Sequence, residues 1–250
     1  MRVVSLHPDV LVATSAIWQT NCTIVRRAGG IAAASGPPDD RSEIGAGDET
    51  FVIDSPILPE ELEALAALLA QVGFPAPSGL LATHADWDHL LGRLAFPDAA
   101  LGCAASTVER MSRSPGEAQR ELRAFDQRFH IERAHPLMLG QIQALAVPGR
   151  CEIGAQELEL HQTEGHTEDG MAVSAPWARV LVVGDYLSTV EPPQIGESSS
   201  IAAYIQTLER LRPLVSRAEH VVPGHGPVLD RDRALSVLEE HIASLGGGGA

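Results

Sequence analysis

The segment Thr83-His84-Ala85-Asp86-Trp87-Asp88-His89, followed by Gly92, decides the fold of this chain. It places two imidazoles and two carboxylates directly after the apolar run 80–83, in a connection that is predicted to join a strand to a helix. Histidine nitrogens and carboxylate oxygens both ligate divalent cations. Side chains two apart lie on one side of an extended segment, so His84 and Asp86 can face one cation while Asp88 and His89 turn toward a second. The segment therefore predicts a metal-binding loop.

Further candidate ligands follow other apolar runs along the chain. They are His166, Asp185 and His225. With the four residues of the first segment they make a set of four imidazoles and three carboxylates, which suits two divalent cations because one carboxylate can bridge both.

The apolar periodicity predicts a fold in which strands and helices come in two successive batches. Strands are predicted over 10–13, 21–25, 50–53, 80–83, 100–104, 180–183 and 221–222, a hairpin over 152–162, and helices over 59–73, 200–214 and 230–245. The polar segment 107–143 predicts two or three helices, and its chemistry cannot be interpreted from its residues. This order favours an α+β fold, a four-layer αβ/βα sandwich, formed as a single domain over 1–250. Composition predicts a flexible loop near 29–48 and a flexible glycine-rich tail over 246–250.

The bulk composition excludes several classes of function. The formal charge of −15 disfavours nucleic acid as a partner, because affinity for phosphates depends on cationic side chains. All 18 basic residues are arginine, so Schiff-base chemistry on a lysine is excluded. The three widely spaced cysteines argue against a disulfide framework, and no apolar stretch is long enough for a membrane span or a signal peptide. We expect a cytoplasmic protein with a small-molecule substrate and no membrane partner. The residues do not determine the oligomeric state, and a homodimer stays open.

The segment at 83–92 resembles the HxHxDHxxG motif of the metallo-β-lactamase superfamily. Later motifs of that superfamily follow in order: Asp54 after a strand, Gly165-His166, Gly184-Asp185, and Pro223-Gly224-His225-Gly226. Together these motifs cover most of the chain. The resemblance implies the metallo-β-lactamase fold and a binuclear centre of two divalent metal ions, with zinc as the first choice.

The resemblance also implies a role for each site residue. One metal would be held by His84, Asp86 and His166, and the other by Asp88, His89 and His225, with Asp185 as the bridging ligand. Asp54 would support the site from behind. Asp88 would also be catalytic, by orienting the attacking water or passing a proton to the leaving group.

Asp86 departs from the motif, because most of the superfamily carries histidine at this position. A third ligand carboxylate makes the centre about one charge unit less positive and should weaken the acidity of the bound water. It also makes iron or manganese credible beside zinc, since oxygen ligands suit these metals. Some relatives do carry a carboxylate there, in the HxExDH pattern of the di-iron flavoproteins and the HxDxDH pattern of the competence-protein hydrolase domains.

The sequence excludes more substrates than it selects. Within the superfamily that the chain resembles, we expect neither a glutathione thioester, a nucleic acid nor a β-lactam as substrate, because the sequence shows no basic C-terminal region for glutathione, no extra domain or basic arm of the nuclease type, and no lysine of the kind with which many β-lactamases hold a drug carboxylate. What remains is a metallo-hydrolase that acts on a small ester, thioester or lactone. The alternatives left open are a di-iron redox or oxygen-binding protein of the same fold, and a phosphodiesterase. Aromatic candidates for the substrate wall are Trp18, Trp87, Tyr186 and Tyr204, each of which is more typical of a core.

Overall fold

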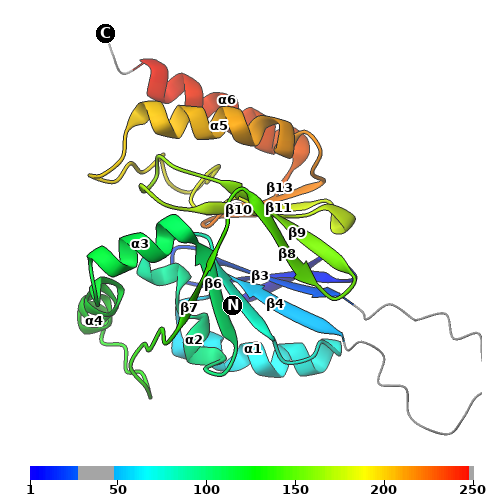
Figure 1. The fold of residues 1–250 in the computed structure, drawn as a ribbon, viewed down its shortest axis with the longest axis vertical. Coiled ribbons are helices and arrows are strands. Elements are labelled where there is room, and N and C mark those ends of the chain that lie inside the picture. Colours follow the sequence, from blue (N-terminus) through cyan, green and yellow to red (C-terminus); the bar gives the residue numbers. More distant parts are fainter. Residues whose placement is uncertain (28–47, 248–250) are drawn as a thin grey trace, which may run out of the picture.

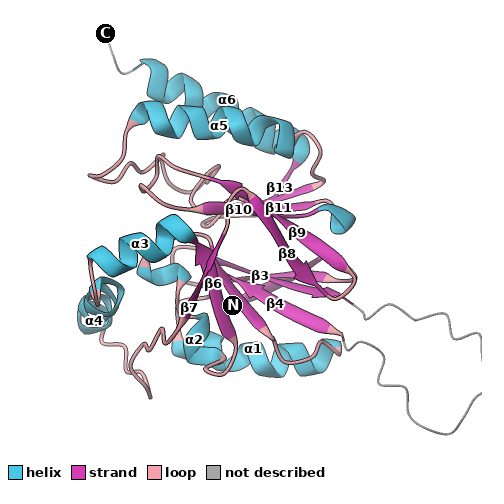
Figure 2. Cartoon of the chain, viewed as in Figure 1, coloured by secondary structure: helices cyan, strands magenta, loops and turns pink. Residues whose placement is uncertain are grey.

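The computed structural model describes residues 1–27 and 48–247, and these residues form two facing sheets with helices on their outer sides (Figures 1 and 2). In Figure 1 the helices α5 and α6 lie above the upper sheet, while α1 and α2 lie below the lower one. The predicted α+β fold and its four-layer arrangement of helix, sheet, sheet and helix are confirmed.

The first sheet has seven strands in the described residues, which neighbour one another in chain order. The strands are β1 (Arg2–His7), β2 (Val10–Thr14), β3 (Asn21–Arg27), β4 (Glu49–Ile53), β5 (Gly79–Ala82), β6 (Ala100–Ala104) and β7 (Ile142–Leu145). The pairs β1–β2, β2–β3 and β3–β4 are antiparallel, whereas β4 to β7 run parallel to one another. Consecutive parallel strands end at the same sheet edge, and the loop that follows β5 therefore lies beside the end of β4.

The second sheet has six strands within the same described ranges, in the order β13-β12-β11-β10-β9-β8. They are β8 (Gly149–Ile153), β9 (Gln156–Gln162), β10 (Met171–Ala175), β11 (Val180–Val182), β12 (His220–Val222) and β13 (Leu229–Asp230). The parallel pair β11 and β12 brings their carboxyl ends together, and both ends lead into predicted ligands. Apolar side chains from both sheets, such as Val12, Ile53, Leu81, Leu160 and Val182, form the core between them.

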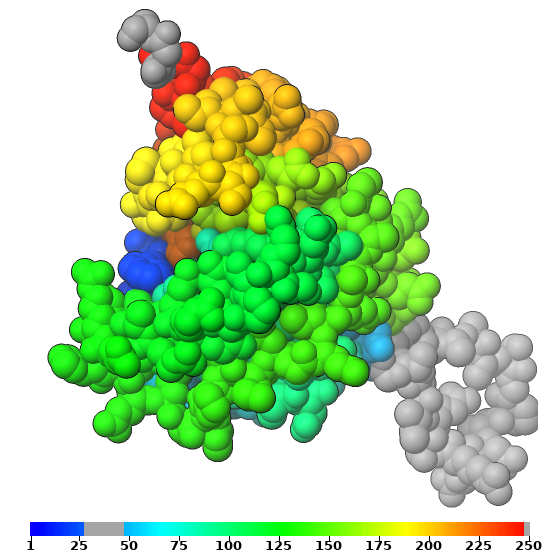
Figure 3. Space-filling model, turned by 60° about the vertical axis from the view of Figure 1, so that its left-hand side comes forward, coloured from blue at the N-terminus to red at the C-terminus, as the bar shows by residue number. Residues whose placement is uncertain are grey.

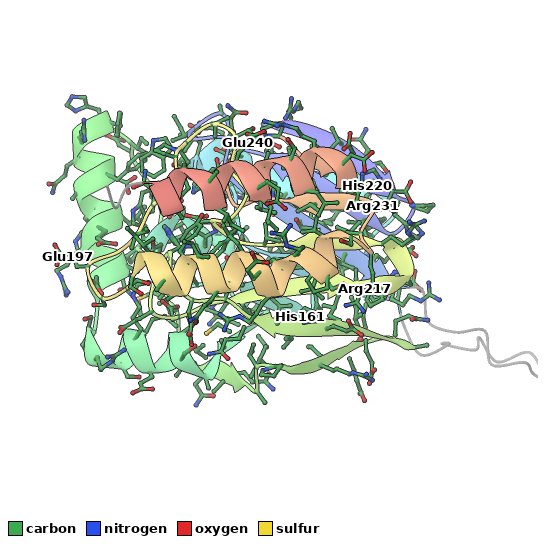
Figure 4. All side chains as sticks on the ribbon, turned by 90° about the horizontal axis from the view of Figure 1, so that it is seen from above. His161, Glu197, Arg217, His220, Arg231 and Glu240 are labelled. Carbon is green, nitrogen blue, oxygen red and sulfur yellow. The ribbon has the colours of Figure 1, made fainter. Side chains whose placement is uncertain are left out.

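Helices cover the outer face of each sheet. They are α1 (Pro59–Val72), α2 (Gly92–Ala95), α3 (Ala105–Arg113), α4 (Glu117–Phe129), α5 (Ile201–Val215) and α6 (Arg231–Gly246), with short 3-10 turns η1 (Trp87–His89) and η2 (Pro176–Ala178). The helix α1 has proline in its first turn and ends at Gly73 in the left-handed conformation. From above, α5 and α6 lie side by side and antiparallel, with Arg217 and Arg231 at the same end (Figure 4). None of the described helices has the length and apolar character that a bilayer span requires.

The structure differs from the sequence prediction in four strands and two boundaries. The strands β1, β7, β10 and β13 were not predicted. Polar residues interrupt β1, which lies at a sheet edge, and β7 is a short, half-exposed strand at the end of the polar segment. That segment contains two helices, as predicted, but gives way to β7 at Ile142. The predicted loop near 29–48 falls almost entirely outside the described residues, as do 248–250 of the predicted tail, while Gly246 belongs to α6.

Candidate metal centre

All seven predicted ligands lie together at one end of the two sheets. His84, Asp86, Asp88 and His89 come from the loop that follows β5 in the first sheet. His166 follows β9, Asp185 follows β11 and His225 follows β12, all in the second sheet. The site therefore joins the two halves of the chain, and every ligand segment begins where a buried strand ends.

Asp54 holds the loop after β5 in place. Its carboxylate accepts hydrogen bonds from the Thr83 backbone N–H at 2.8 Å and from the Thr83 hydroxyl at 2.9 Å. One of its oxygens also lies 3.1 Å from His89 Nδ1. Asp54 has a φ of 59°, in the left-handed region that aspartate tolerates better than most residues. Its place behind the ligands matches the supporting role that the resemblance implied.

The first group of candidate ligands consists of His84, Asp86 and His166, and one atom from each lies within 4.8 Å of the others. Asp86 Oδ2 lies 3.5 Å from His84 Nε2 and 3.4 Å from His166 Nε2. This is the set of residues that the resemblance assigned to one metal. The structure brings it together in space, and its role as a ligand set stays a prediction.

The second group consists of Asp88, His89 and His225 within the same distance limit. Asp88 Oδ2 lies 3.6 Å from His89 Nε2 and 3.3 Å from His225 Nε2. The sheets hold His89 fully buried, while Asp88 and His225 keep slight exposure toward the pocket. This group matches the second predicted set.

Asp185 lies between the two groups, where the predicted bridging ligand should be. Its Oδ2 is 3.3 Å from His166 Nε2 and 3.4 Å from His225 Nε2, which belong to different groups. Its Oδ1 is 3.1 Å from His89 Nε2. A side chain at Gly224 would clash with Oδ1 of Asp185, so the glycine of the Pro223-Gly224-His225 motif allows this close approach.

The four histidines all direct Nδ1 toward a protein group and Nε2 toward the centre. The Nδ1 atoms of three of them share a hydrogen bond with an oxygen: Thr83 Oγ1 at 3.0 Å for His84, the Gln194 carbonyl at 3.0 Å for His166, and Thr20 Oγ1 at 3.2 Å for His225. His89 Nδ1 lies 3.1 Å from an oxygen of Asp54. Partners of this kind fix the ring orientation of metal-ligating histidines.

The donor atoms at the centre fit bound cations. Among the described residues, Nε2 of His84, His89 and His166 and Oδ1 of Asp185 are buried and make no hydrogen bond. Buried polar atoms are seldom left without a partner. Three imidazole nitrogens and a carboxylate oxygen that converge in this way form the donor set that divalent transition metals bind.

The pKa values show how strongly the carboxylates and imidazoles interact. Burial alone would lower the pKa of His225, but contacts with Asp185 and Asp88 raise it to about 10. Burial alone would raise the pKa of Asp185, yet the surrounding histidines hold it well below its usual range. The carboxylates therefore favour positive charge at the centre, supplied either by protons or by metal ions.

Four members of the two groups, Asp86, Asp88, His166 and His225, line a pocket of about 690 Å³. Its lining comes from the β2–β3 loop, the loop after β5, the helices α3 and α4, and the long loop after β11. Figure 3 shows the face of the molecule where these two helices, in green, approach the loop after β11, in yellow. Trp18 is half-exposed on this wall and lies 5.2 Å from the Phe125 ring and 5.6 Å from the Trp87 ring. The pocket is thus apolar on one side and acidic on the floor.

The four aromatic candidates have different positions. Trp18 and Trp87 line the pocket, although Trp87 is buried for most of its surface. Tyr186 and Tyr204 are buried beneath the site: the Tyr186 hydroxyl accepts a hydrogen bond from the His166 backbone N–H at 3.0 Å, and the Tyr204 hydroxyl donates to the Asp185 carbonyl at 3.3 Å. These two tyrosines support ligand segments and do not contact the pocket.

Sequence reasoning missed three charged residues around the centre. Arg110 of α3 lines the pocket and binds Asp86, and the buried Asp169 binds Arg110 from the other side. Glu191 follows Asp185 in the chain and lies close to Asp185 and His225. Its position in the loop after Asp185 was a usable signal, whereas Arg110 is one of many arginines in a polar helical segment and carried none.

Comparison with known proteins supports the same architecture. The family model described as Metallo-beta-lactamase superfamily matches residues 43–225. A metallo-β-lactamase from Pontibacter korlensis is 17% identical and superposes with a TM-score of 0.66 over 98% of both chains. A metallo-β-lactamase family protein from Thermus thermophilus is 20% identical, with a TM-score of 0.67 over 97% of this chain and 82% of that one. The DIM-1 metallo-β-lactamase is 16% identical, with a TM-score of 0.63 over 99% and 98% of the two chains. No curated protein matches the chain in sequence.

Proposed function

The chain belongs to the metallo-β-lactamase superfamily, and from this premise we propose that it is a hydrolase that uses two divalent metal ions to cleave a small, uncharged ester, thioester or lactone. One observation carries the proposal. Imidazole Nε2 atoms from both groups, and Oδ1 of Asp185 between them, are buried and make no hydrogen bond, and they converge beside an open pocket.

The first group, His84, Asp86 and His166, would hold one ion, and Asp88, His89 and His225 would hold the other, with Asp185 between them. Bound divalent ions would supply a water that loses its proton near neutral pH and would polarise the substrate carbonyl. Zinc is the first choice because four of the seven ligands are imidazoles.

Asp88 is the residue that we assign to proton handling. Its Oδ2 lies at the pocket floor beside His225, and the carboxylate lines the pocket. From there it can orient the attacking water and accept its proton, and then donate that proton to the leaving alkoxide or thiolate. Trp18 and Trp87 supply the apolar wall against which the acyl part of the substrate would pack.

The charge of the pocket lining supports an uncharged substrate. Five carboxylates line the pocket: Asp86, Asp88, Glu121, Asp185 and Glu191. Arg110 is the only arginine among the described lining residues, and both its terminal nitrogens already bind carboxylates. These lining residues therefore offer no free arginine to a phosphate or to the carboxylate of a β-lactam, which disfavours the phosphodiesterase alternative.

The second candidate function is di-iron redox or oxygen chemistry, and Asp86 favours it, since a carboxylate in the first group suits iron or manganese. This alternative predicts iron in protein produced without added metal, together with a visible absorption band that responds to oxygen. The hydrolase predicts zinc or another redox-inert ion and no such band. Elemental analysis with an absorption spectrum separates the two functions.

The hydrolase proposal is tested with metal-replete protein, a chelator and a panel of p-nitrophenyl esters, acyl thioesters, lactones, a phosphodiester and a cephalosporin. We expect hydrolysis of one acyl class, its loss on chelation, and its recovery on adding zinc. Asp88→Asn should lower kcat by about 100-fold or more, the usual contribution of a general acid or base. Metal-replete protein that cleaves nothing in the panel would count against the proposal.

Two further predictions accompany the proposed function. We infer a cytoplasmic location from the composition, and a small molecule as partner in place of nucleic acid or membrane. A homodimer stays open. Fractionation of cells and light scattering of the purified protein test these points.

A further inference from the structure

We propose that Arg110 is a positioning residue that fixes the carboxylate of Asp86 so that only one of its oxygens faces the first metal group. The inference rests on the proposed function, because it concerns how the chain prepares one ligand of that site. Among the candidate ligands, Arg110 binds Asp86, and it acts on the centre through this residue.

The geometry of Asp86 divides its two oxygens between two tasks. Oδ2 points to the centre, 3.4 Å from His166 Nε2 and 3.5 Å from His84 Nε2. Oδ1 accepts a hydrogen bond from Arg110 Nη2 at 2.7 Å. A carboxylate that is engaged in this way cannot rotate to offer both oxygens to one cation.

Asp86 needs such a restraint more than the other carboxylate ligands do. Its side chain is 29% exposed, against 9% for Asp88 and for Asp185. An exposed aspartate has open space into which it can swing, and it then gains hydration at the expense of the site. Arg110 is 20% exposed and covers this side of Asp86 from α3.

Arg110 is in turn held by a buried anchor. Its Nη1 donates to Asp169 Oδ1 at 2.9 Å, and the Asp169 side chain has no exposure. The other oxygen of Asp169 accepts the backbone N–H of Ala85 at 3.1 Å, directly beside the ligand. The planar guanidinium thus spans two carboxylates in a fixed direction, which an ammonium group cannot reproduce.

Arg110 has two opposing effects on metal affinity, and the change in affinity on its substitution shows which effect is larger. Its positive charge repels a cation in the first group, so removal of the charge alone would strengthen metal binding. Its grip on Asp86 preorganises a ligand, and loss of comparable supporting contacts typically weakens metal binding by about 10- to 100-fold. We expect positioning to outweigh repulsion, because Asp169 offsets part of the charge of Arg110.

The experiment measures equilibrium zinc affinity by competition with a chromophoric chelator, and records the visible spectrum of the cobalt(II) form. Wild type, Arg110→Met, Arg110→Lys and the control Arg113→Met are compared. Arg113 lies on the same helix and pairs at the surface with Glu168, which is not one of the candidate ligands. We expect a loss of about 10- to 100-fold for one of two zinc ions in both Arg110 variants, an altered cobalt spectrum, and wild-type behaviour of the control.

A double-mutant cycle with Asp86→His separates positioning from support of the fold. The anchor at Asp169 is disturbed equally in both backgrounds, so its contribution cancels. We expect Arg110→Met to cost clearly less affinity when residue 86 is histidine. Equal losses in the two backgrounds, unchanged or stronger binding in Arg110→Met, or wild-type affinity in Arg110→Lys would overturn the inference. Wild-type protein that binds zinc but hydrolyses no ester would contradict the proposed function and leave the positioning role intact.

Discussion

At the scale of single residues, the candidate metal centre depends on where its seven ligands lie along the chain. The seven candidate ligands lie together because each ligand segment follows a buried strand, and these strands end at the same end of the two sheets. The charge account of Asp86 is revised by the structure. Sequence reasoning treated its carboxylate as uncompensated, whereas Arg110 lies 2.7 Å from one oxygen. A contact between a helix and a loop that are far apart in the chain leaves no periodic signal, so this partner could not be predicted.

Metal binding should release protons at neutral pH. Burial would lower the pKa of His225, but its carboxylate neighbours raise it to about 10, and the pKa of His166 is raised by Asp86 and Asp185 against the same effect of burial. Without metal the His225 imidazole is protonated on both nitrogens at pH 7, and a metal ion must displace the proton on the ligating nitrogen. Apparent zinc affinity should therefore increase as the pH rises toward the pKa of His225. Calorimetry of zinc binding in two buffers with different ionisation enthalpies measures the release, and identical heats in both buffers would contradict it.

At the scale of elements, the predicted strands and helices were mostly found, with boundaries shifted by a few residues. The helix α1 is a clear case, because proline at its start, an apolar stripe and Gly73 at its end all agree. The strand β10 was missed although it is almost fully buried. A short apolar run without alternation is ambiguous between strand and buried helix, and only its pairing with β9 and β11 settles the assignment.

One contact between elements connects α1 to the wall of the pocket. Glu61 of α1 accepts hydrogen bonds from the Ser15 hydroxyl at 2.6 Å and from the Ala16 N–H at 2.8 Å. Residues 15 and 16 begin the loop that carries Trp18 over the pocket. Burial would raise the pKa of Glu61, but these bonds and one from the Leu58 N–H lower it overall from its ordinary value of 4.5.

Glu61→Gln should therefore destabilise the protein in a pH-dependent way. A carboxylate whose pKa is lower in the folded state stabilises the fold above its unfolded value of 4.5, and that stability is lost as the pH falls through the folded pKa. We expect the variant to lose about 1–2 kcal/mol at pH 7, a usual amount for hydrogen bonds to a charged group, and the gap to wild type to narrow below pH 4.5. Urea unfolding at several pH values measures this gap.

The control is Glu63→Gln, which changes an exposed glutamate on the same helix. It should leave the free energy of unfolding within about 0.5 kcal/mol of wild type at every pH. A Glu61→Gln variant with the same stability profile as this control would show that the hydrogen bonds to the β2–β3 loop contribute nothing.

At the scale of the whole molecule, two sheets from two halves of the chain meet at an acidic pocket in a protein of net charge −15. Composition predicted the sign of this charge but not its placement. The acidic rim residues Glu121 and Glu191 come from α4 and from the loop after β11, and only the packed fold puts them at one opening. The pocket therefore has a charge preference that the sequence alone did not specify.

An ester with a carboxylate on its acyl group should be a poorer substrate than its neutral isostere. The charges of two metal ions would be largely matched by the three ligand carboxylates. The acidic rim residues Glu121 and Glu191 would therefore decide the preference between anionic and neutral substrates. We expect kcat/KM to be lower by about tenfold for the anionic ester, equivalent to about 1.4 kcal/mol of repulsion, with a smaller difference at high salt. Steady-state kinetics of wild type and Glu121→Gln test this expectation. The substitution should narrow the gap, and a wild-type preference for the anion would refute the prediction.

The position of the ligands on both sheets has a consequence for the durability of the fold. His84 and His89 belong to one half of the chain and His166 and His225 to the other, and the three cysteines in the described residues are free thiols. Bound ions would therefore act as reversible cross-links between the two halves of the chain, as disulfides do in secreted proteins. A ligand present at about 100 times its dissociation constant adds about 2.7 kcal/mol to folding stability. The lifetime of the protein in a cell would then follow the local supply of metal, and starvation for that metal would remove the protein by unfolding.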